Sequence, residues 1–188
     1  MTETSQITYQ QHSMPRLNEP APDFDAVTTH GQRSLSDYKG KWLILFSHPA
    51  DFTPVCTTEF MAFAKAHDKF AALNTDLLGL SMKVANAYGM IMPGADDTSA
   101  VRATFIIDPD GVLRAMVYYP MSNGRSIDEF LRLVQALQAS DKNKVATPEN
   151  WKPGEPVIVP PPQTTEAADA RKGEGFEYTD WYFSKKSL

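Results

Sequence analysis

The pattern of apolar and polar residues predicts strands that alternate with helices. Apolar runs of strand length predict strands over 41–47, 76–81, 103–108 and 112–119, the first two of them buried. Asp110 and Gly111 predict a hairpin turn between the last two. Apolar residues recur every three or four positions in two other segments, which predicts helices over 55–73 and 127–139. Residues 17–24 fit an extended first strand or loop, and 84–90 a helical turn. This alternation indicates an α/β sandwich.

The last forty or so residues differ in character from the rest of the chain. Six prolines between Thr147 and Pro162 predict an extended arm and exclude a helix there. Beyond them the aromatic residues crowd together: Phe176, Tyr178, Trp181, Tyr182 and Phe183. A free aromatic tail would leave an apolar patch exposed, so we expect it to dock on the domain or on a partner subunit. We therefore divide the chain into a domain over residues 1–146 and an arm, with a role in dimerisation, over 147–188.

Composition and charge limit the classes of partner. The chain of 188 residues is 42% hydrophobic, enough for a single core. Its 23 acidic and 18 basic residues give a net charge of -5 without a Lys/Arg cluster, which argues against nucleic acid or an anionic membrane as partner. No apolar stretch approaches the ~18 residues of a membrane span, and residues 1–11 have neither a basic start nor an apolar run. We expect a soluble, cytoplasmic protein with a small uncharged or polar substrate.

A single cysteine, Cys56, is the main candidate for chemistry. One cysteine cannot form an internal disulfide, a CxxC redox pair or a thiolate zinc site, so it is either a small buried hydrophobe or a reactive thiol. Thr53 suits the N-cap of the following helix and Pro54 its first position, which places Cys56 at the third. The unpaired N–H groups and the dipole of a helix start favour the thiolate. We therefore expect a pKa below the ~8.5 of a free cysteine.

A thiolate in this position can attack the O–O bond of a peroxide. The reaction needs a hydroxyl group to hold the peroxide, a cation to stabilise the thiolate and the charge on the leaving oxygen, and a lid against water. Thr53, an arginine, and Pro49 with Phe52 are the candidates for these three tasks. An inert buried cysteine remains the alternative at this point.

The segment around Cys56 resembles the active site of the peroxiredoxins. Residues 48–59, HPADFTPVCTTE, contain the family's pattern of Pro, three residues, Thr, two residues, Cys. The His-Pro start and Thr57 resemble the one-cysteine, peroxiredoxin 6-like branch. Further segments resemble the family over nearly the whole chain from about residue 18: 101–111, 118–125, 127–138, 145–155 and 157–162. The resemblance implies a thioredoxin-like α/β fold, a central mixed sheet flanked by helices, with an arm that packs across a partner subunit.

The resemblance also implies roles for individual residues. The peroxidatic cysteine falls on Cys56, the family's hydroxyl on Thr53, its shielding proline on Pro49 and its active-site arginine on Arg102. The alternative roles are an N-cap for Thr53, a turn for Pro49 and an ordinary strand-end arginine for Arg102.

Three further residues match the family in supporting positions. Arg125 matches a second arginine that the family links to an acid at Glu59, and His48 matches the histidine before the proline. The alternatives are a purely structural ion pair for Glu59 and Arg125, and a local hydrogen bond for His48.

Two features depart from the family. The predicted strand ending at Ser81 runs into a helix-like segment at Met82 without Gly, Pro, Asn or Asp between them. Family members carry several tens of residues there, a helix and a strand, so about one crossover is missing. Either the sequence omits a stretch or the protein is a deletion form with an exposed sheet edge. In addition, the aromatic tail lacks the cysteines of some relatives, so no resolving cysteine exists.

We interpret the chain as a thiol-specific peroxidase that reduces hydrogen peroxide and organic hydroperoxides through a sulfenic acid on Cys56. An external thiol recycles the enzyme, and no metal or organic cofactor is implied. A homodimer or higher homo-oligomer is expected. The alternative from another class is a non-catalytic thioredoxin-fold holdase or binding module. A cysteine protease fits less well, because no papain-like or caspase-like segment surrounds Cys56.

Overall fold

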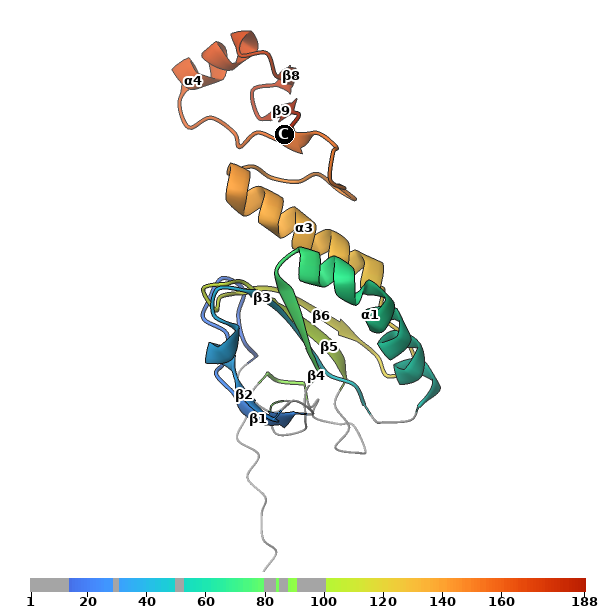
Figure 1. Cartoon of the computed structure of the whole chain (residues 1–188). Coiled ribbons are helices and arrows are strands. Elements are labelled where there is room, and N and C mark those ends of the chain that lie inside the picture. Colours follow the sequence, from blue (N-terminus) through green and yellow to red (C-terminus); the bar gives the residue numbers. More distant parts are fainter. Residues whose placement is uncertain (1–13, 29–30, 50–52, 80–83, 85–87, 91–100) are drawn as a thin grey trace, which may run out of the picture. The chain divides into compact units, whose positions relative to one another are not determined.

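The computed structural model describes residues 14–188 except 29–30, 50–52, 80–83, 85–87 and 91–100 (Figure 1). The chain divides into two compact units, Met1–Arg125 and Ser126–Leu188. Each unit is described by itself below. The predicted organisation into a domain up to residue 146 and an arm after it stays a prediction.

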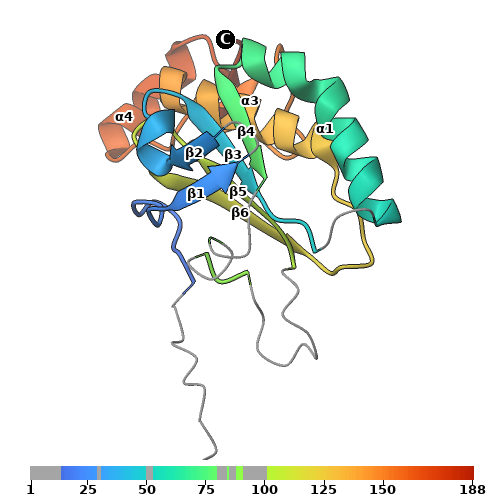
Figure 2. The same ribbon diagram turned by 60° about the horizontal axis from the view of Figure 1, so that its bottom comes forward.

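A four-stranded mixed sheet forms the first unit, in the order β4-β3-β5-β6 (Figures 1 and 2). The strands are β3 (Trp42–Phe46), β4 (Thr75–Gly79), β5 (Arg102–Ile107) and β6 (Leu113–Tyr119). β3 and β4 are parallel, whereas β3 and β5, and β5 and β6, are antiparallel. The α/β class and all four predicted strands are thereby confirmed.

Burial along the strands follows their places in the sheet. Every residue of the two central strands, β3 and β5, is buried. β4 was also predicted to be buried, but it is only partly so, because it is the edge strand among the described residues. Its Leu78 is buried, whereas Gly79 is exposed. An apolar run alone does not reveal that a neighbouring strand is missing on one side.

Helix α1 (Pro54–Ala72) follows β3 and contacts β4. Its buried residues recur at helical spacing and define its inner face: Cys56, Glu59, Phe63, Ala66 and Phe70. The predicted helix over 55–73 is confirmed. A short hairpin of β1 (Asp25–Thr28) and β2 (Gly31–Ser34) and the 3-10 helix η1 (Leu35–Tyr38) precede β3 and were not predicted, because their residues are largely exposed and polar. The predicted helical turn at 84–90 cannot be followed as a whole, because residues 85–87 lie outside the described residues.

Aromatic residues pack at the centre of the first unit. Phe105 is completely buried and contacts the rings of Tyr88 and Tyr118 edge to face, at centroid distances of 4.9 and 5.7 Å. The Tyr88 hydroxyl donates to the carbonyl of Pro22 at 2.7 Å, so its burial leaves no polar group unsatisfied there. Burial raises the pKa of Tyr118 to about 12, so this ring is neutral in the core.

The predicted turn between β5 and β6 is confirmed. The Asp108 carboxylate accepts hydrogen bonds from the backbone N–H of Asp110 at 3.0 Å and of Val112 at 2.9 Å. Gly111 has a φ of 82°, in the left-handed region that side chains disfavour. The turn therefore depends on one side chain and one glycine.

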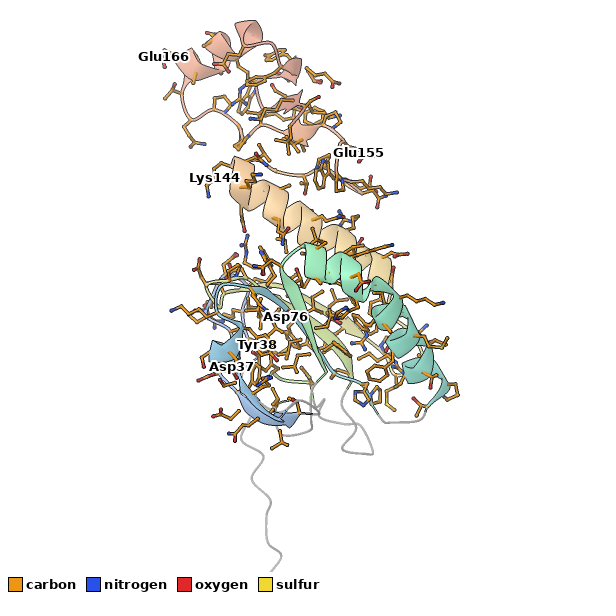
Figure 3. The ribbon with its side chains drawn as sticks, in the orientation of Figure 1. Asp37, Tyr38, Asp76, Lys144, Glu155 and Glu166 are labelled. Atoms are coloured by element: carbon orange, nitrogen blue, oxygen red, sulfur yellow. The ribbon has the colours of Figure 1, made fainter. Side chains whose placement is uncertain are left out.

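The second unit begins with helix α3 (Ile127–Asn143), which confirms the helix predicted over 127–139. The Ser126 hydroxyl caps it by accepting from the N–H of Glu129, and Lys144, labelled in Figure 3, ends it in the left-handed conformation. The remaining elements are β7 (Val157–Ile158), α4 (Thr165–Ala170), the 3-10 helix η2 (Arg171–Gly173), β8 (Glu177–Asp180) and β9 (Phe183–Lys186).

The proline-rich stretch contains no helix, as predicted, but it is not extended throughout: Trp151 N–H donates to the Pro148 carbonyl at 3.2 Å and Glu155 N–H to the Lys152 carbonyl at 3.0 Å, which close two turns. The aromatic tail forms regular structure that the sequence did not indicate. β8 and β9 form a hairpin that pairs with β7, in the order β7-β9-β8. Trp181 and Tyr182, between the two strands, are 53% and 56% exposed and contact each other edge to face at 5.6 Å. The hairpin pairs the backbone of the tail. The rings of Trp181 and Tyr182 stay exposed among the described residues.

We predict that Gly111→Ala lowers the free energy of unfolding by about 1 kcal/mol, because an L-residue is strained at this φ. A Cβ at this position would meet no atom within 4 Å, so the loss is conformational and not steric. Gly79→Ala is the matched control, since its Cβ makes only ordinary contact with the Phe46 ring at 3.5 Å. Urea titrations followed by circular dichroism measure both. Equal stabilities for the two variants would contradict the assignment of strain to the turn.

Candidate active site

The connection from β3 to α1 places Cys56 in the first turn of the helix. Thr53 is the N-cap, in extended conformation at φ -95° and ψ 148°, and Pro54 begins the helix. Cys56 therefore lies at the third helical position, as predicted, and is only 1% exposed. The Thr53 side chain makes no capping hydrogen bond. The backbone carbonyl of Thr53 accepts hydrogen bonds from the N–H and the hydroxyl of Thr57, both at 3.0 Å.

Arg102, the first residue of β5, brings a cation to the sulfur. Its Nη1 lies 3.3 Å from Cys56 Sγ and donates to Glu59 Oε2 at 2.9 Å. Its Nε donates to the carbonyl of Met121 at 2.9 Å. The residue is 2% exposed, so little solvent screens its charge from the sulfur. This arrangement favours the thiolate form of Cys56.

Glu59 lies one turn beyond Cys56 on α1 and links both arginines. Arg125 donates to Glu59 Oε1 from its backbone N–H at 2.7 Å and from Nε at 3.0 Å, and to Oε2 from Nη2 at 2.8 Å. Burial by itself raises the pKa of Glu59. The hydrogen bonds from Arg125, together with the charges of Arg125 and Arg102, outweigh burial and hold the pKa below its usual range. Glu59 is therefore an ionised acceptor for both guanidinium groups.

The charges in this buried cluster do not balance while the thiol is protonated. Two guanidinium groups face one carboxylate, and all three side chains are less than 5% exposed. Among the residues that the structure describes, one positive charge is then in excess, and an unpaired buried charge is costly. Ionisation of Cys56 supplies the missing negative charge beside Arg102. The cluster as a whole, and not the helix start alone, therefore favours a thiolate.

Other residues that fix the cluster were missed by sequence reasoning. Arg125 Nη1 donates to the Ala103 carbonyl at 2.7 Å and to Thr104 Oγ1 at 3.1 Å, and its guanidinium lies 5.6 Å above the centre of the Phe46 ring. Thr104 gives a weak signal, as a polar residue inside an apolar strand. The carbonyls of Met121 and Ala103 give none, because every residue has one.

The loop before α1 holds the remaining sequence-predicted residues. His48 is half-buried and its ring contacts Phe60 edge to face at 5.2 Å. Pro49 is half-buried in the same loop, and Phe52 lies outside the described residues. The structure thus brings Cys56, Glu59, Arg102 and Arg125 into one cluster. It places Thr53 at the start of the same helix and His48 and Pro49 in the loop that precedes it.

Two wider searches covered the described part of the chain. It contains no group of three or more His, Cys, Asp or Glu side chains that could hold a metal ion. None of its helices is long and apolar enough to cross a membrane.

Comparison with protein families gives two matches. The model of the AhpC/TSA family matches residues 17–83, which include the helix start with Cys56. The model of the C-terminal domain of 1-Cys peroxiredoxin matches residues 136–175, in the second unit. The two matches together span the segment with Cys56 and most of the proline-rich arm.

Whole-length relatives agree with the family matches. A peroxiredoxin of Aquifex aeolicus is 47% identical and covers 94% of this chain and 98% of its own length. One of Methanosarcina mazei is 46% identical over 92% of this chain and 98% of its own length. Among solved structures, the yeast mitochondrial 1-Cys peroxiredoxin superposes with a TM-score of 0.82 at 36% identity, covering 93% of this chain and all of that one. Peroxiredoxin 6 of Arenicola marina gives a TM-score of 0.75 at 31% identity, covering 83% and 88%.

The relatives are longer within the aligned span. The alignment with the Aquifex protein has 219 positions. The aligned 94% of this 188-residue chain fills about 177 of them, so about 40 positions of the relative have no counterpart here. The predicted junction between Ser81 and Met82 lies outside the described residues, but β4 just before it is the edge of the sheet in what is described. The length difference agrees in size with the predicted missing crossover.

The fold, the buried cluster around one cysteine and the relatives that match along almost their whole length agree. The chain belongs to the peroxiredoxin family of thiol-dependent peroxidases and has the single cysteine of its one-cysteine members.

Proposed function

We propose that Cys56 is the peroxidatic residue of this peroxidase and that Arg102 is the cation that activates it. The observation that supports this most strongly is the 3.3 Å approach of Arg102 Nη1 to Cys56 Sγ inside a cluster with one positive charge in excess. Thr53 and Pro49 are proposed to hold and shield the peroxide from the loop and the helix start. Glu59 and Arg125 orient Arg102, and His48 supports the loop through Phe60.

The proposed reaction transfers one oxygen atom. The Cys56 thiolate attacks the terminal oxygen of ROOH, an S–O bond forms and the O–O bond breaks. The sulfur becomes a sulfenic acid, and the leaving RO⁻ takes a proton from solvent to give water or an alcohol. Arg102 stabilises the thiolate first and the negative charge on the departing oxygen afterwards, which lowers the barrier. Thr53 orients the peroxide through its hydroxyl.

Recycling requires thiols from outside the chain, because Cys56 is the single cysteine. One external thiol condenses with the sulfenic acid: an S–S bond forms, the S–O bond breaks, and the hydroxyl leaves as water with the proton of the thiol, which gives a mixed disulfide. A second thiolate attacks that disulfide and releases Cys56. The yeast mitochondrial relative is described as resolved through glutathione/thioredoxin systems. We propose reductants of the same chemical class here.

The proposal also covers the substrate class, the cellular location and the oligomeric state. Hydrogen peroxide and small organic hydroperoxides suit a small site with a positive charge. A cytoplasmic location, and the absence of nucleic-acid and membrane partners, follow from composition alone and stay predictions. A homodimer or higher homo-oligomer is proposed because Trp181 and Tyr182 remain exposed at the tip of the β8–β9 hairpin.

We predict that Cys56→Ser abolishes peroxide consumption in a coupled assay with dithiothreitol. Arg102→Ala and Thr53→Val should lower the second-order rate constant by ~10² to 10³, the usual effect of losing one donor to a transition-state charge. Arg33→Ala, at an exposed position of β2, is the control for loss of an arginine and should keep the wild-type rate. Activity that persists in Cys56→Ser would remove Cys56 from the mechanism, and a wild type that consumes no peroxide would favour the holdase alternative. A near-wild-type rate for Arg102→Ala or Thr53→Val would remove that residue from the mechanism.

We predict a pH-dependent stability difference between the wild type and Glu59→Gln. The folded pKa of Glu59 lies below the ordinary 4.5, so its stabilising charge is fully present above that pH and is lost as the pH falls through the folded value. Above pH 4.5 the variant should be less stable by about 3 kcal/mol, since it leaves buried arginines unpaired. Urea titrations between pH 3 and 8 measure the difference, with the fully exposed Asp68→Asn as control. A difference that grows on acidification would contradict the pairing.

We predict that the protein is a dimer in light scattering, at about twice its 20.9 kDa, and that the arm contributes to assembly. Replacing Trp181 and Tyr182 together by Ala should weaken the dimer, because large apolar surface at an interface is lost. Val27→Ala, at an 83% exposed position of the first unit, is the control. A form that ends at Asn150 removes the arm entirely. If this form assembles like the full chain, the arm has no role in the dimer.

A further inference from the structure

Arg102 lies at the centre of a tight turn that begins β5. The backbone N–H of Ala103 donates to the carbonyl of Val101 at 3.0 Å, which closes a three-residue turn around Arg102. The side chain of Arg102 is fixed at its far end by Glu59 and the Met121 carbonyl. The side chain starts from the backbone of this turn, so the position of Nη1 relative to the sulfur also depends on how firmly the turn is held.

The hydroxyl of Ser47 bridges both ends of that turn. Ser47 Oγ accepts from the N–H of Ala103 at 2.9 Å and donates to the carbonyl of Val101 at 2.5 Å. The backbone N–H of Ser47 also donates to the Ala103 carbonyl at 3.0 Å. The residue is 1% exposed, so water does not replace these bonds readily. Ser47 thus binds both peptide groups that flank Arg102.

Ser47 stands where the regular pairing of β3 and β5 stops. The paired residues end at Phe46 and Thr104, so Ser47 and Ala103 come next along the two strands. Beyond that point β5 bends into the turn. Without the hydroxyl, the Val101 carbonyl and the Ala103 N–H would keep only their three-residue bond to each other, and the turn would lose its cross-strand support.

We propose that Ser47 is a positioning residue for Arg102. It does not contact the sulfur, and it acts by holding the backbone on both sides of Arg102 so that Nη1 stays 3.3 Å from Cys56 Sγ. The proposal rests on the proposed role of Arg102 in activating Cys56. It assigns a part in the reaction to a residue that precedes the peroxiredoxin motif in the sequence.

The first test compares Ser47→Ala and Ser47→Thr with the wild type. Ser47→Ala should slow peroxide reduction about 10-fold, less than the ~10² that a 1 Å misplacement can cost. It should also raise the pH at which alkylation of Cys56 by iodoacetamide reaches half its maximal rate, because Arg102 stabilises the thiolate less well. Ser47→Thr keeps the hydroxyl and should restore both values. An unchanged rate and alkylation profile in Ser47→Ala would overturn the proposal.

Thr75→Val is the matched control for loss of a buried hydroxyl. Thr75 is 3% exposed, donates to the Leu73 carbonyl at 3.1 Å and pairs with Trp42 at the opposite end of β3. It should lower stability without changing the rate or the alkylation profile. If it changes both as Ser47→Ala does, the effect is a general loosening of the sheet and the proposal is wrong.

A double-mutant cycle with Arg102→Ala separates the proposal from the proposed function. If Ser47 acts through Arg102, Ser47→Ala should slow the reaction no further in the Arg102→Ala background. A full additional effect there would overturn the positioning role. A near-wild-type rate for Arg102→Ala alone would instead overturn the proposed function.

The hydroxyl can also be tested if Ser47→Ala does not fold. Ser47→Thr and Ser47→Val have nearly the same volume and differ by one hydroxyl. Thr should then exceed Val in rate by about the same 10-fold factor as serine exceeds alanine. Equal rates and equal alkylation profiles for the two would overturn the proposal.

Discussion

The pairing of buried charge is the constraint on which this site depends. Arg102, Arg125 and Glu59 are all withdrawn from water beside Cys56, and each guanidinium donates to the same carboxylate. Buried charges are stable only when they are paired and hydrogen-bonded. With one carboxylate for two arginines, the cluster is incomplete until the sulfur carries a negative charge. The reactivity of the cysteine thus follows from the electrostatic balance of its surroundings.

The fold satisfies this constraint by bringing three separate segments to one place. The start of α1 supplies the cysteine and the glutamate, the start of β5 supplies one arginine, and the end of the loop after β6 supplies the other. The bend of β5 is held by Ser47 at the end of β3, and the carbonyls of Ala103 and Met121 accept from the two guanidinium groups. Rigid strands on both sides limit how far the charges can move apart.

The positions that the Aquifex relative has in addition are not needed to assemble the cluster. About 40 positions of the Aquifex relative have no counterpart, yet Cys56, Glu59, Arg102 and Arg125 are all present and in contact. β4 is the edge strand of the sheet among the described residues. β4 is short and carries Asp76, labelled in Figure 3, in an ion pair with Lys41 at 3.1 Å. Short length and charge both limit pairing between exposed edges of separate molecules.

The sequence by itself determined the four strands of the mixed sheet, the two long helices, the turn at Gly111 and the position of Cys56 in its helix. These features depend on neighbours along the chain: the period of the apolar residues, a proline at a helix start, a glycine at a positive φ. The motif also indicated candidate residues for the chemistry, of which the structure brings Cys56, Glu59, Arg102 and Arg125 together. It did not show that β4 is an edge strand, that the aromatic tail forms a hairpin, or that Ser47, Thr104 and two carbonyls complete the cluster. Only the tertiary structure decided these, because they depend on which distant segments share a buried space, and a backbone carbonyl looks the same at every position of a sequence.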